Sequence, residues 1–491
     1  MTTIPPDAAH PSGATTGRPA ALEDRAFFGQ PRGLSLLFLA EMWERFSYYG
    51  MRALLVLYMV HVLKWTDAHA SNLYGSYTGL TFLTPLFGGY LADKWIGTRR
   101  SLVLGGVIIA CGHFVLALDS LASFYAGLAL VVIGTGFFKP NVSTMVGQLY
   151  PPGDQRRDAG FTIFYMGINL GATVAPFVCG YLAQSAGFQE TLTHMGFNPA
   201  RSWSWGFGAA GVGMLCGLAL YVTLRDRYLP GIGVRASQTG PTLAARGQVA
   251  TAPSAATITE TGGPLSPDER KRVISLLILF IFVACFWLVY EQGGSSLNLF
   301  ADRYTDLHVG SSLVPSSYFQ SAQPLFVITL APLFALLWTR LRKAGREPST
   351  PAKMVFGLGL LSVGCLFLIV GGHVVDACMG SHAATACAVA SPAWLTMFYL
   401  FSVLGELCVS PVGLSYVTKV APARYVGFLM GAWFLTNASG LKLAGFVASL
   451  ASTMPSQVSF FSILLVISAA AGALLFFCVP TIKRLTASVQ L

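Results

Sequence analysis

The sequence predicts an all-α integral membrane protein in which twelve membrane-spanning helices form two six-helix bundles, with both termini in the cytoplasm. Its 491 residues are 54% hydrophobic and only 11% charged, whereas soluble domains average about 25% charged residues. Apolar runs of about 20 residues, long enough to cross a bilayer, recur along the chain. Lys and Arg gather in alternate connections between these runs, a pattern that orients membrane proteins.

The apolar runs fall into two groups of six. The first group comprises residues 33–62, 72–92, 101–118, 121–148, 159–186 and 202–224, and the second comprises 271–300, 314–342, 352–374, 392–419, 425–451 and 457–480. Residues 231–270 between the groups are rich in Gly, Ala, Thr, Ser and Pro and contain no aromatic residue, which predicts a flexible linker. We therefore expect a cytoplasmic tail, two bundles separated by the linker, and a second tail, at residues 1–32, 33–230, 231–270, 271–480 and 481–491.

The distribution of basic residues sets the expected orientation. In this topology the outer loops hold only Lys64, Arg201 and Arg303, and the cytoplasmic segments hold most of the remaining Lys and Arg. The formal net charge of +10 then reflects the cytoplasmic loops of a multi-pass protein of the cytoplasmic (inner) membrane, and we expect no nucleic-acid partner. The polar N-terminal segment lacks the apolar core of a signal peptide, so we expect it to stay in the cytoplasm.

Charged residues interrupt the first apolar run. Placing Glu41, Glu44 or Arg45 at bilayer depth costs at least about 2.5–3.5 kcal/mol per charge. At 100° per residue, one helix face carries all of the following: Glu41, Glu44, Arg45, Tyr48 and Arg52. A structural salt bridge from Glu41 to Arg45 is the simpler interpretation, but it leaves the second Glu and the second Arg unexplained. The pattern therefore favours a functional site.

Further charges occur inside later runs, at Lys139, Glu291, Glu406 and Lys442. Together with the first run they give four cations and four anions, and such a balance suits a cavity that binds a zwitterion. Arg52 and Lys139 are candidates to bind a carboxylate, and Glu406 is a candidate to bind an ammonium group, with Asn169 beside it. A snorkelling role for Lys139 and a structural role for Glu406 stay open as alternatives.

Residues 88–100 (Gly-Gly-Tyr-Leu-Ala-Asp-Lys-Trp-Ile-Gly-Thr-Arg-Arg) follow the second run. Their spacing resembles the loop signature of the major facilitator superfamily, whose two six-helix halves pack around a cavity near the middle of the membrane. The arrangement of six runs, a linker and six more runs is the layout of that superfamily.

Six motifs resemble those of one family within it, the proton-coupled oligopeptide transporters. They are Glu41–Gly50, Phe138–Ser143, Phe164–Gly171, Trp287 with Glu291–Gln292, Glu406 with Ser410–Gly413, and Trp433–Phe434. They occur in order between about residue 33 and residue 480. The resemblance implies a secondary active transporter, one that takes up di- and tripeptides by proton-coupled symport and alternating access.

The resemblance also implies roles for individual residues. Proton coupling is expected of Glu41, Glu44, Arg45 and Glu291. Peptide binding is expected of Tyr48, Arg52, Lys139, Asn169, Trp287, Gln323, Glu406 and Trp433, although the aromatic members are also ordinary packing residues in membrane helices. The peptide carboxylate is expected at Arg52 and Lys139, and the amino group at Glu406. Two ion pairs between the halves are expected to act as gates, Arg52–Glu291 toward the outside and Lys139–Glu406 toward the inside.

The chain departs from the family pattern at several positions. Phe82 stands where the family often has Tyr, Gln323 replaces a usual Asn, and Gly75 occupies the place of the proton-sensing His of animal relatives. Proton coupling is therefore expected to rest on carboxylates. The linker has no apolar run for the two extra helices of many bacterial relatives. In the outer loop before the tenth run, Cys378 and Cys387 are candidates for a disulfide.

A symporter of the same fold for another small substrate, such as nitrate or a peptide-like drug, stays open. An enzyme is disfavoured, because the sequence has no HExxH motif, no GxSxG nucleophile elbow in a polar context and no GxxxxGK[ST] loop. A channel is disfavoured because the charges are paired rather than arranged in rings. We expect no cofactor and no metal, a proton gradient as the energy source, and a monomer in the lipid bilayer.

Overall fold

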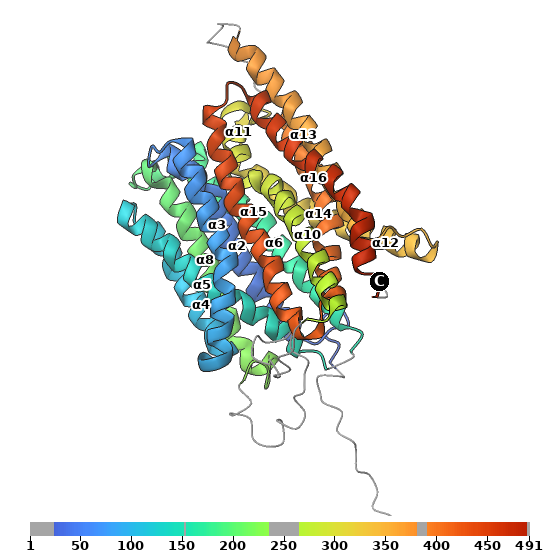
Figure 1. Cartoon of the computed structure of the whole chain (residues 1–491). Coiled ribbons are helices and arrows are strands. Elements are labelled where there is room, and N and C mark those ends of the chain that lie inside the picture. The colour runs from blue at the N-terminus through green and yellow to red at the C-terminus, as the bar shows by residue number, and fades with distance from the viewer. Residues whose placement is uncertain (1–23, 152–153, 235–264, 381–389, 489–491) are drawn as a thin grey trace, which may run out of the picture.

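The computed structural model describes residues 24–151, 154–234, 265–380 and 390–488, and these are almost entirely helical (Figure 1). The long helices of the first half are α2 (Gly33–His61), α3 (Asp67–Leu91), α4 (Thr98–Leu116), α5 (Leu121–Gln148), α6 (Arg157–Gln184) and α8 (Ser202–Tyr228). Those of the second half are α10 (Pro267–Tyr290), α12 (Ala322–Lys343), α13 (Thr350–Gly380), α14 (Pro392–Val420), α15 (Val426–Leu450) and α16 (Gln457–Leu485). The shorter elements are α7 (Ala186–His194), α11 (Ser296–Tyr304), β1 (His308–Val309) and β2 (Ser312–Leu313).

Each of the twelve apolar runs overlaps one of these long helices. Ten helices in the described ranges have the length and the apolar composition needed to cross a membrane, so the predicted all-α membrane architecture is confirmed to that extent. Helices α2 and α3 are not among the ten, and α2 carries four charged side chains, Glu41, Glu44, Arg45 and Arg52. The count of twelve spans and the side on which the termini lie stay predictions. Most of the expected linker, and parts of both expected tails, lie outside the described residues.

The seventh apolar run, expected as one span over residues 271–300, lies within a candidate span at Pro267–Tyr304 but is not one continuous helix. Helix α10 ends at Tyr290, a 3₁₀ turn covers Glu291–Gly294, and α11 begins at Ser296. The physical reason lies in the glycines of the turn, because a Cβ on Gly294 would lie 1.7 Å from the hydroxyl oxygen of Tyr74 on α3. Only a glycine lets the backbone approach α3 so closely, and the break places Glu291 at the contact between the two halves.

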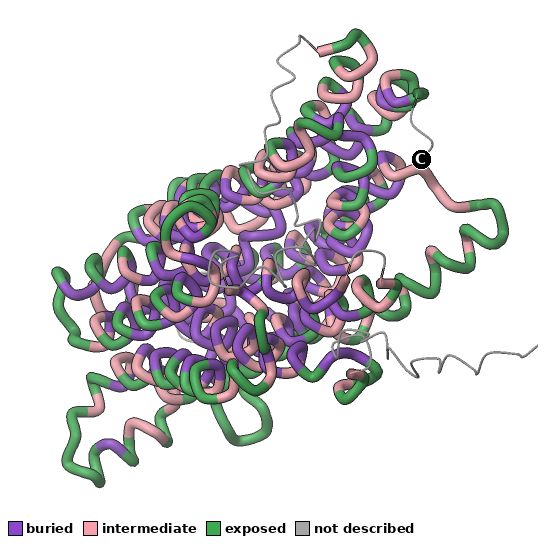
Figure 2. Tube along the Cα trace, turned by 90° about the horizontal axis from the view of Figure 1, so that it is seen from below, coloured by how far each residue is buried: buried purple, intermediate pink, exposed green. Residues whose placement is uncertain are grey.

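The helices of each half pack mainly against one another. In the first half α2 contacts α6 and α8, and α4 contacts α5, while in the second half α13 contacts α14 and α16. Two seams join the halves, α3 with α15 and α6 with α12. The tube in Figure 2 shows buried residues along the interior, with exposed residues on the rim and in the projecting segments. One buried apolar cluster is built from residues 276–482, and two others are built mainly from residues 34–229.

The end of α13 carries a disulfide-bonded cysteine. Cys378 takes part in a disulfide, whereas its expected partner, Cys387, lies outside the described residues. The remaining seven cysteines are free and are distributed over the helices, as expected for small apolar side chains in membrane spans.

Glycines permit the close approach of α3 and α15 at the seam between the halves. A Cβ on Gly445 would lie 2.5 Å from the backbone oxygen of Ser71 and 2.6 Å from the Cα of Gly75. Even one methyl group would therefore separate the two helices or distort them. Small residues at such contacts let helix backbones pack directly against each other in a membrane.

We predict that Gly445→Ala destabilises the folded protein by about 1–3 kcal/mol, the usual cost of overpacking a close contact. Gly359→Ala is the matched control, because a Cβ at Gly359 of α13 meets no atom within 4 Å. Thermal unfolding in detergent should show a lower melting temperature for the first variant and an equal or higher one for the second. Equal melting temperatures for both variants would contradict the close approach of α3 and α15.

Candidate functional site

The charged face of α2 is buried in the structure. Glu41, Glu44, Arg45 and Tyr48 are at most 4% exposed, and Arg52 is 8% exposed. The helix places them on one side, as its periodicity predicts. The opposite side carries Trp43 and Phe46. One helix therefore separates a polar interior from an apolar exterior.

Arg45 binds both glutamates of the face. Its Nη2 donates to Oε1 of Glu44 at 2.6 Å, and its Nε contacts Oε2 of the same carboxylate. The same Nε lies 3.3 Å from Oε1 of Glu41, so the expected i, i+4 pair is present, together with a second carboxylate. The guanidinium also lies 5.1 Å from the ring centre of Tyr48. Oε2 of Glu41 has no hydrogen-bond partner among the described residues, so one carboxylate oxygen stays available to accept a proton.

Lys139 of α5 lies near this cluster without forming an ion pair in the described part of the chain. Its Nζ lies 3.9 Å from the ring centre of Phe82 on α3, a cation–π contact. It interacts electrostatically with Arg45, Glu44 and Glu41. The expected pair of Lys139 with Glu406 is not formed in this structure. The Phe that departs from the family pattern therefore supplies a cation–π contact to the Lys139 ammonium group.

Arg52 joins the two halves. Its Nη2 contacts Oε2 of Glu291 in a buried ion pair, and its Nε donates to the hydroxyl of Tyr74 at 2.5 Å. The rings of Tyr49 and Tyr74 lie 5.6 and 5.7 Å from the guanidinium. An ion pair taken out of water is costly to leave with one partner. The contact between Arg52 and Glu291 therefore holds α2 against the break that follows α10.

Glu406 of α14 is bound by hydroxyl groups rather than by a cation. The hydroxyl of Tyr290 donates to Oε2 at 2.5 Å, and the hydroxyl of Tyr165 on α6 donates to Oε1 at 3.5 Å. Glu406 is only 7% exposed and forms no ion pair with any residue that the structure describes. Asn169, one turn beyond Tyr165, uses its amide to donate to the backbone oxygen of Tyr165 at 2.9 Å. A carboxylate that lacks a cationic partner suits an ammonium ligand.

The remaining expected binding residues occupy two kinds of position. Trp287 packs edge-on against Tyr290 with ring centres 5.1 Å apart, and its indole nitrogen has no partner among the described residues. Gln323 of α12 lies beside Gly293 of the helix break. Trp433, in contrast, is only 2% exposed and packs against Phe280 inside the second-half core. The structure thus places Trp287 beside Tyr290, which binds Glu406, and Gln323 beside the helix break, whereas Trp433 lies in the apolar core.

Lys442, counted with the intramembrane cations, also lies apart from the cluster. It is exposed on α15, and its Nζ donates to the hydroxyl of Ser76 on α3 at 2.7 Å. The four cations counted in the sequence therefore do not all lie among the buried charged groups, and the equal numbers of cations and anions do not describe those groups.

Sequence reasoning missed the tyrosines that bind the charged groups. Tyr74 binds Arg52, and Tyr165 and Tyr290 bind Glu406, while Thr81 contacts the hydroxyl of Tyr48 at 3.3 Å. Two of the tyrosines were visible in the sequence, since Tyr165 lies in a quoted motif and Tyr290 directly precedes Glu291. Aromatic residues are common in membrane helices as packing groups, so residue type alone did not distinguish them.

A second set of contacts joins the halves near the end of α11. Asp302 and Arg303 are consecutive, and each binds a different first-half helix. Nε2 of His61 at the end of α2 lies 2.6 Å from Oδ2 of Asp302. Arg303 makes two hydrogen bonds, of 2.6 and 2.7 Å, to Asp67 at the start of α3. These pairs lie at the same end of α2 and α3 as Arg52 and Tyr74.

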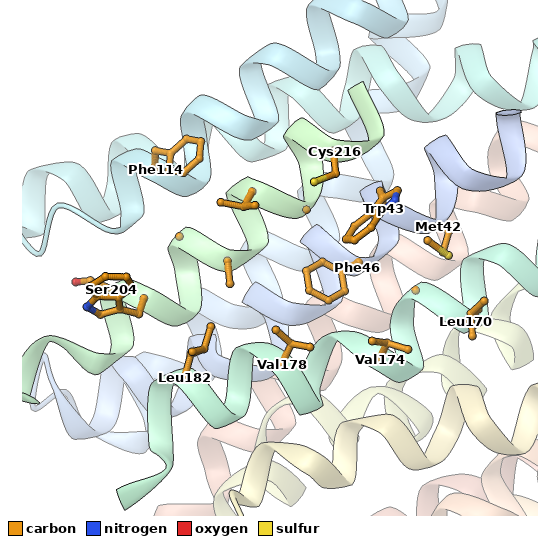
Figure 3. Close-up of a pocket in the computed structure, with 16 residues that line it drawn as sticks. Met42, Trp43, Phe46, Phe114, Leu170, Val174, Val178, Leu182, Ser204 and Cys216 are labelled. Carbon is orange, nitrogen blue, oxygen red and sulfur yellow. The ribbon is translucent and has the colours of Figure 1, made fainter. Parts of the chain in front are cut away.

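The large apolar groove of the first half is distinct from this cluster. It has a volume of about 780 Å³ and lies between α2, α4, α6 and α8. Figure 3 shows Trp43 and Phe46 of α2 on its floor, with Val174 and Val178 of α6 along one side. The groove contains no charged side chain among its lining residues. It therefore belongs to the apolar exterior of α2 and not to the polar interior.

A helical membrane protein whose two halves meet through a buried ion pair, with further charged side chains in the interior, has features typical of membrane transporters. The sequence pattern of the POT family matches residues 99–229 and 248–464. The chain belongs to the POT family, and the resemblance seen in its motifs is confirmed. Proton-coupled uptake of di- and tripeptides is the function of this family, and its members are transporters and not enzymes.

Curated relatives align over almost the whole chain. The transporter YclF of Bacillus subtilis is 38% identical, and the alignment covers 94% of this chain and 96% of that protein. The peptide transporter YePEPT of Yersinia enterocolitica is 36% identical, with 95% and 97% covered. The di-/tripeptide transporter of Lactococcus lactis subsp. cremoris is 32% identical, with 95% and 99% covered.

Solved structures agree with these relatives. The peptide transporter POT in complex with sulfate is 36% identical, with a TM-score of 0.78 over 95% of this chain and 98% of that one. A POT family transporter in complex with 5-aminolevulinic acid is 28% identical, with a TM-score of 0.76 over 94% and 98%.

The contact of Tyr74 with Arg52 gives a prediction about stability. Tyr74→Phe removes an acceptor from a buried guanidinium, and we expect it to destabilise the folded protein by about 1–3 kcal/mol. Tyr77→Phe is the control, because the buried hydroxyl of Tyr77, on the same helix, has no partner among the described residues. Thermal unfolding in detergent measures both variants. An unchanged melting temperature for Tyr74→Phe would show that this hydroxyl does not support Arg52.

Proposed function

We propose that this chain is a proton-coupled symporter that takes up di- and tripeptides across the cytoplasmic membrane by alternating access. One observation carries the proposal. Lys139 of the first half and Glu406 of the second are opposite charges in the interior, and neither takes part in an ion pair with another described residue. A zwitterion supplies the missing partner of each charge at the same time. A simple anion such as nitrate would leave Glu406 unmatched.

We further propose that the transporter has twelve spans in two six-helix bundles, with both termini cytoplasmic. Two observations support this. Helices α2 and α3 are 29 and 25 residues long, enough to cross a bilayer, and basic residues are sparse in every connection placed outside. The chain would then act as a monomer in the lipid bilayer, with the proton as its second substrate.

In the proposed site the peptide carboxylate binds Lys139 and Arg52, and the amino group binds Glu406 beside Asn169. Tyr48, Trp287 and Gln323 are proposed to line the peptide. Trp433, also expected there, packs against Phe280 in this structure and would have to move to reach the peptide. The guanidinium of Arg52 offers a planar fork to the carboxylate, whereas Lys139 offers a point charge. A carboxylate ligand would draw Lys139 away from the ring of Phe82 and Arg52 away from Glu291.

Proton coupling is proposed to rest on Glu41, Glu44 and Arg45, together with Glu291. One guanidinium faces two carboxylates in the buried cluster, so the cluster has a formal charge of −1 when both are ionised. The free oxygen of Glu41 is the position at which a proton would bind at least cost. Protonation would leave Arg45 neutralised by Glu44 alone, and Lys139 would lose part of its attraction to the cluster.

The gates are proposed to be the pairs Arg52–Glu291 and Lys139–Glu406. The first pair is closed in this structure and the second is open, which supports an inward-facing state. The contacts of Asp302 and Arg303 lie at the closed end and add to the outer gate. Protonation of Glu291 would leave no unpaired carboxylate when Arg52 separates from it, and the peptide carboxylate would replace Glu291 as the partner of Arg52. Protons from outside would therefore favour opening toward the outside.

The proposal for the α2 carboxylates gives a transport prediction. In liposomes, Glu44→Gln should abolish concentrative uptake of labelled Ala-Ala on an imposed pH gradient, because the cluster can no longer change charge in the same way. Exchange of labelled for unlabelled peptide should persist. Glu190→Gln is the control, since that carboxylate is 74% exposed on α7. Concentrative uptake by Glu44→Gln would contradict the role of the cluster. Competition by nitrate but not by dipeptides would contradict the proposal that the substrate is a peptide.

The proposal for the outer gate gives a conformational prediction. Glu291→Gln imitates the protonated side chain and should shift the population toward an outward-open state. Double electron–electron resonance between spin labels at the ends of α2 and α11 should show longer distances than in the unsubstituted protein. Arg303→Gln, which removes the pair with Asp67, should shift the same distances in the same direction. Unchanged or shorter distances in Glu291→Gln would overturn the proposal that Arg52 and Glu291 form the outer gate, even if transport were lost.

A further inference from the structure

The strongest polar contact of Glu406 comes from Tyr290, the last residue of α10. Its hydroxyl donates to Oε2 of Glu406 at 2.5 Å, and the two side chains are 8% and 7% exposed. The other donor, the hydroxyl of Tyr165, lies at 3.5 Å from Oε1, near the limit at which a hydrogen bond contributes. One hydroxyl therefore decides how this buried carboxylate is oriented.

The ring of Tyr290 is held in place independently of Glu406. It stacks on Phe286 with ring centres 5.7 Å apart. It also packs edge-to-face with Trp287, with ring centres 5.1 Å apart. Trp287 is itself fixed by α15, because a Cβ on Gly440 would lie 2.5 Å from the Cβ of Trp287. The phenol is thus a fixed donor that aims at the carboxylate.

A carboxylate has two oxygens and about four sites that accept hydrogen bonds. Tyr290 occupies one site on Oε2 and Tyr165 approaches one on Oε1, so about two sites stay free for an ammonium group, which brings three donors. Tyr290 therefore does not compete with the ligand. It prevents rotation of the carboxylate, so binding of the amino group costs less conformational entropy.

We propose that Tyr290 is a positioning residue that fixes the carboxylate of Glu406 for the amino terminus of the peptide and thereby sets the preference for substrates with a free amino group. This inference rests on the proposed function, since it takes Glu406 to bind the substrate amine. It adds a residue outside the sequence motifs and names the substrate feature that the residue selects.

The test compares Ala-Ala with N-acetyl-Ala-Ala, which lacks the charged amine. Purified wild type, Tyr290→Phe and Tyr399→Phe compete each peptide against labelled Ala-Ala in a binding assay that needs no pH gradient. Tyr399 is the matched control, a buried tyrosine of α14 whose hydroxyl has no partner among the described residues. Thermal unfolding checks that each variant is folded, and Tyr290→Gln, which keeps a hydrogen-bond donor, is a second variant.

We expect Tyr290→Phe to weaken binding of Ala-Ala at least tenfold, to leave N-acetyl-Ala-Ala unchanged, and so to lose most of the preference for the free amine. Tyr399→Phe should keep the wild-type preference, and Tyr290→Gln should restore part of it. An equal loss for both peptides would assign Tyr290 a structural role and overturn the inference. An increased preference would make Tyr290 a competitor of the amine and overturn it too. If wild type itself does not bind Ala-Ala, the proposed function fails, whereas an intact preference in Tyr290→Phe removes only the role of Tyr290.

Discussion

The ion pair between Arg52 and Glu291 is the constraint on which the arrangement of the two halves depends. Both side chains are buried, and the two residues are 239 positions apart in sequence. In such surroundings an isolated charge is costly, and the loss of one partner strands the other. The rest of the interface accommodates this pair. Tyr74 supplies a second acceptor to Arg52, and the glycines after α10 let the backbone of the turn approach Tyr74. The helix break thus lets Glu291 lie opposite Arg52.

The other interior charges are bound in a different way. Arg45 is shared by two carboxylates, Lys139 lies on an aromatic ring, and Glu406 accepts hydrogen bonds from two hydroxyls. Aromatic rings and hydroxyls are weaker partners than opposite charges, and a ligand replaces them more easily. The interior thus contains one strong pair, one shared cluster and two weakly bound charges. A site that holds its charges with unequal strength can release the weak ones to a substrate while the strong pair keeps one end closed.

Helix α2 connects this polar interior to the membrane. Its charged face carries the carboxylates, and its other face carries Trp43 and Phe46 on the floor of an apolar groove. The two faces share one backbone, so any rotation of α2 that repositions Glu41 also moves the floor of the groove. Gly171 lets α6 pack directly against α2, because a Cβ there would lie 2.1 Å from the backbone oxygen of Met42.

The sequence alone determined the apolar runs, the family and the helix faces that carry charge. Hydrophobicity and periodicity are local properties, so the limits of the runs and the common face of Glu41 and Arg45 followed without a structure. Which groups meet across helices was decided only by the tertiary structure. The pairing of Lys139 with Glu406 was expected but is not formed. Lys139 lies against the ring of Phe82 instead, and Glu406 accepts a hydrogen bond from Tyr290. The break after Tyr290 escaped prediction as well, because its cause is the approach of Tyr74 from another helix. Contacts of this kind depend on the packing of distant segments, which no pattern within a single run records.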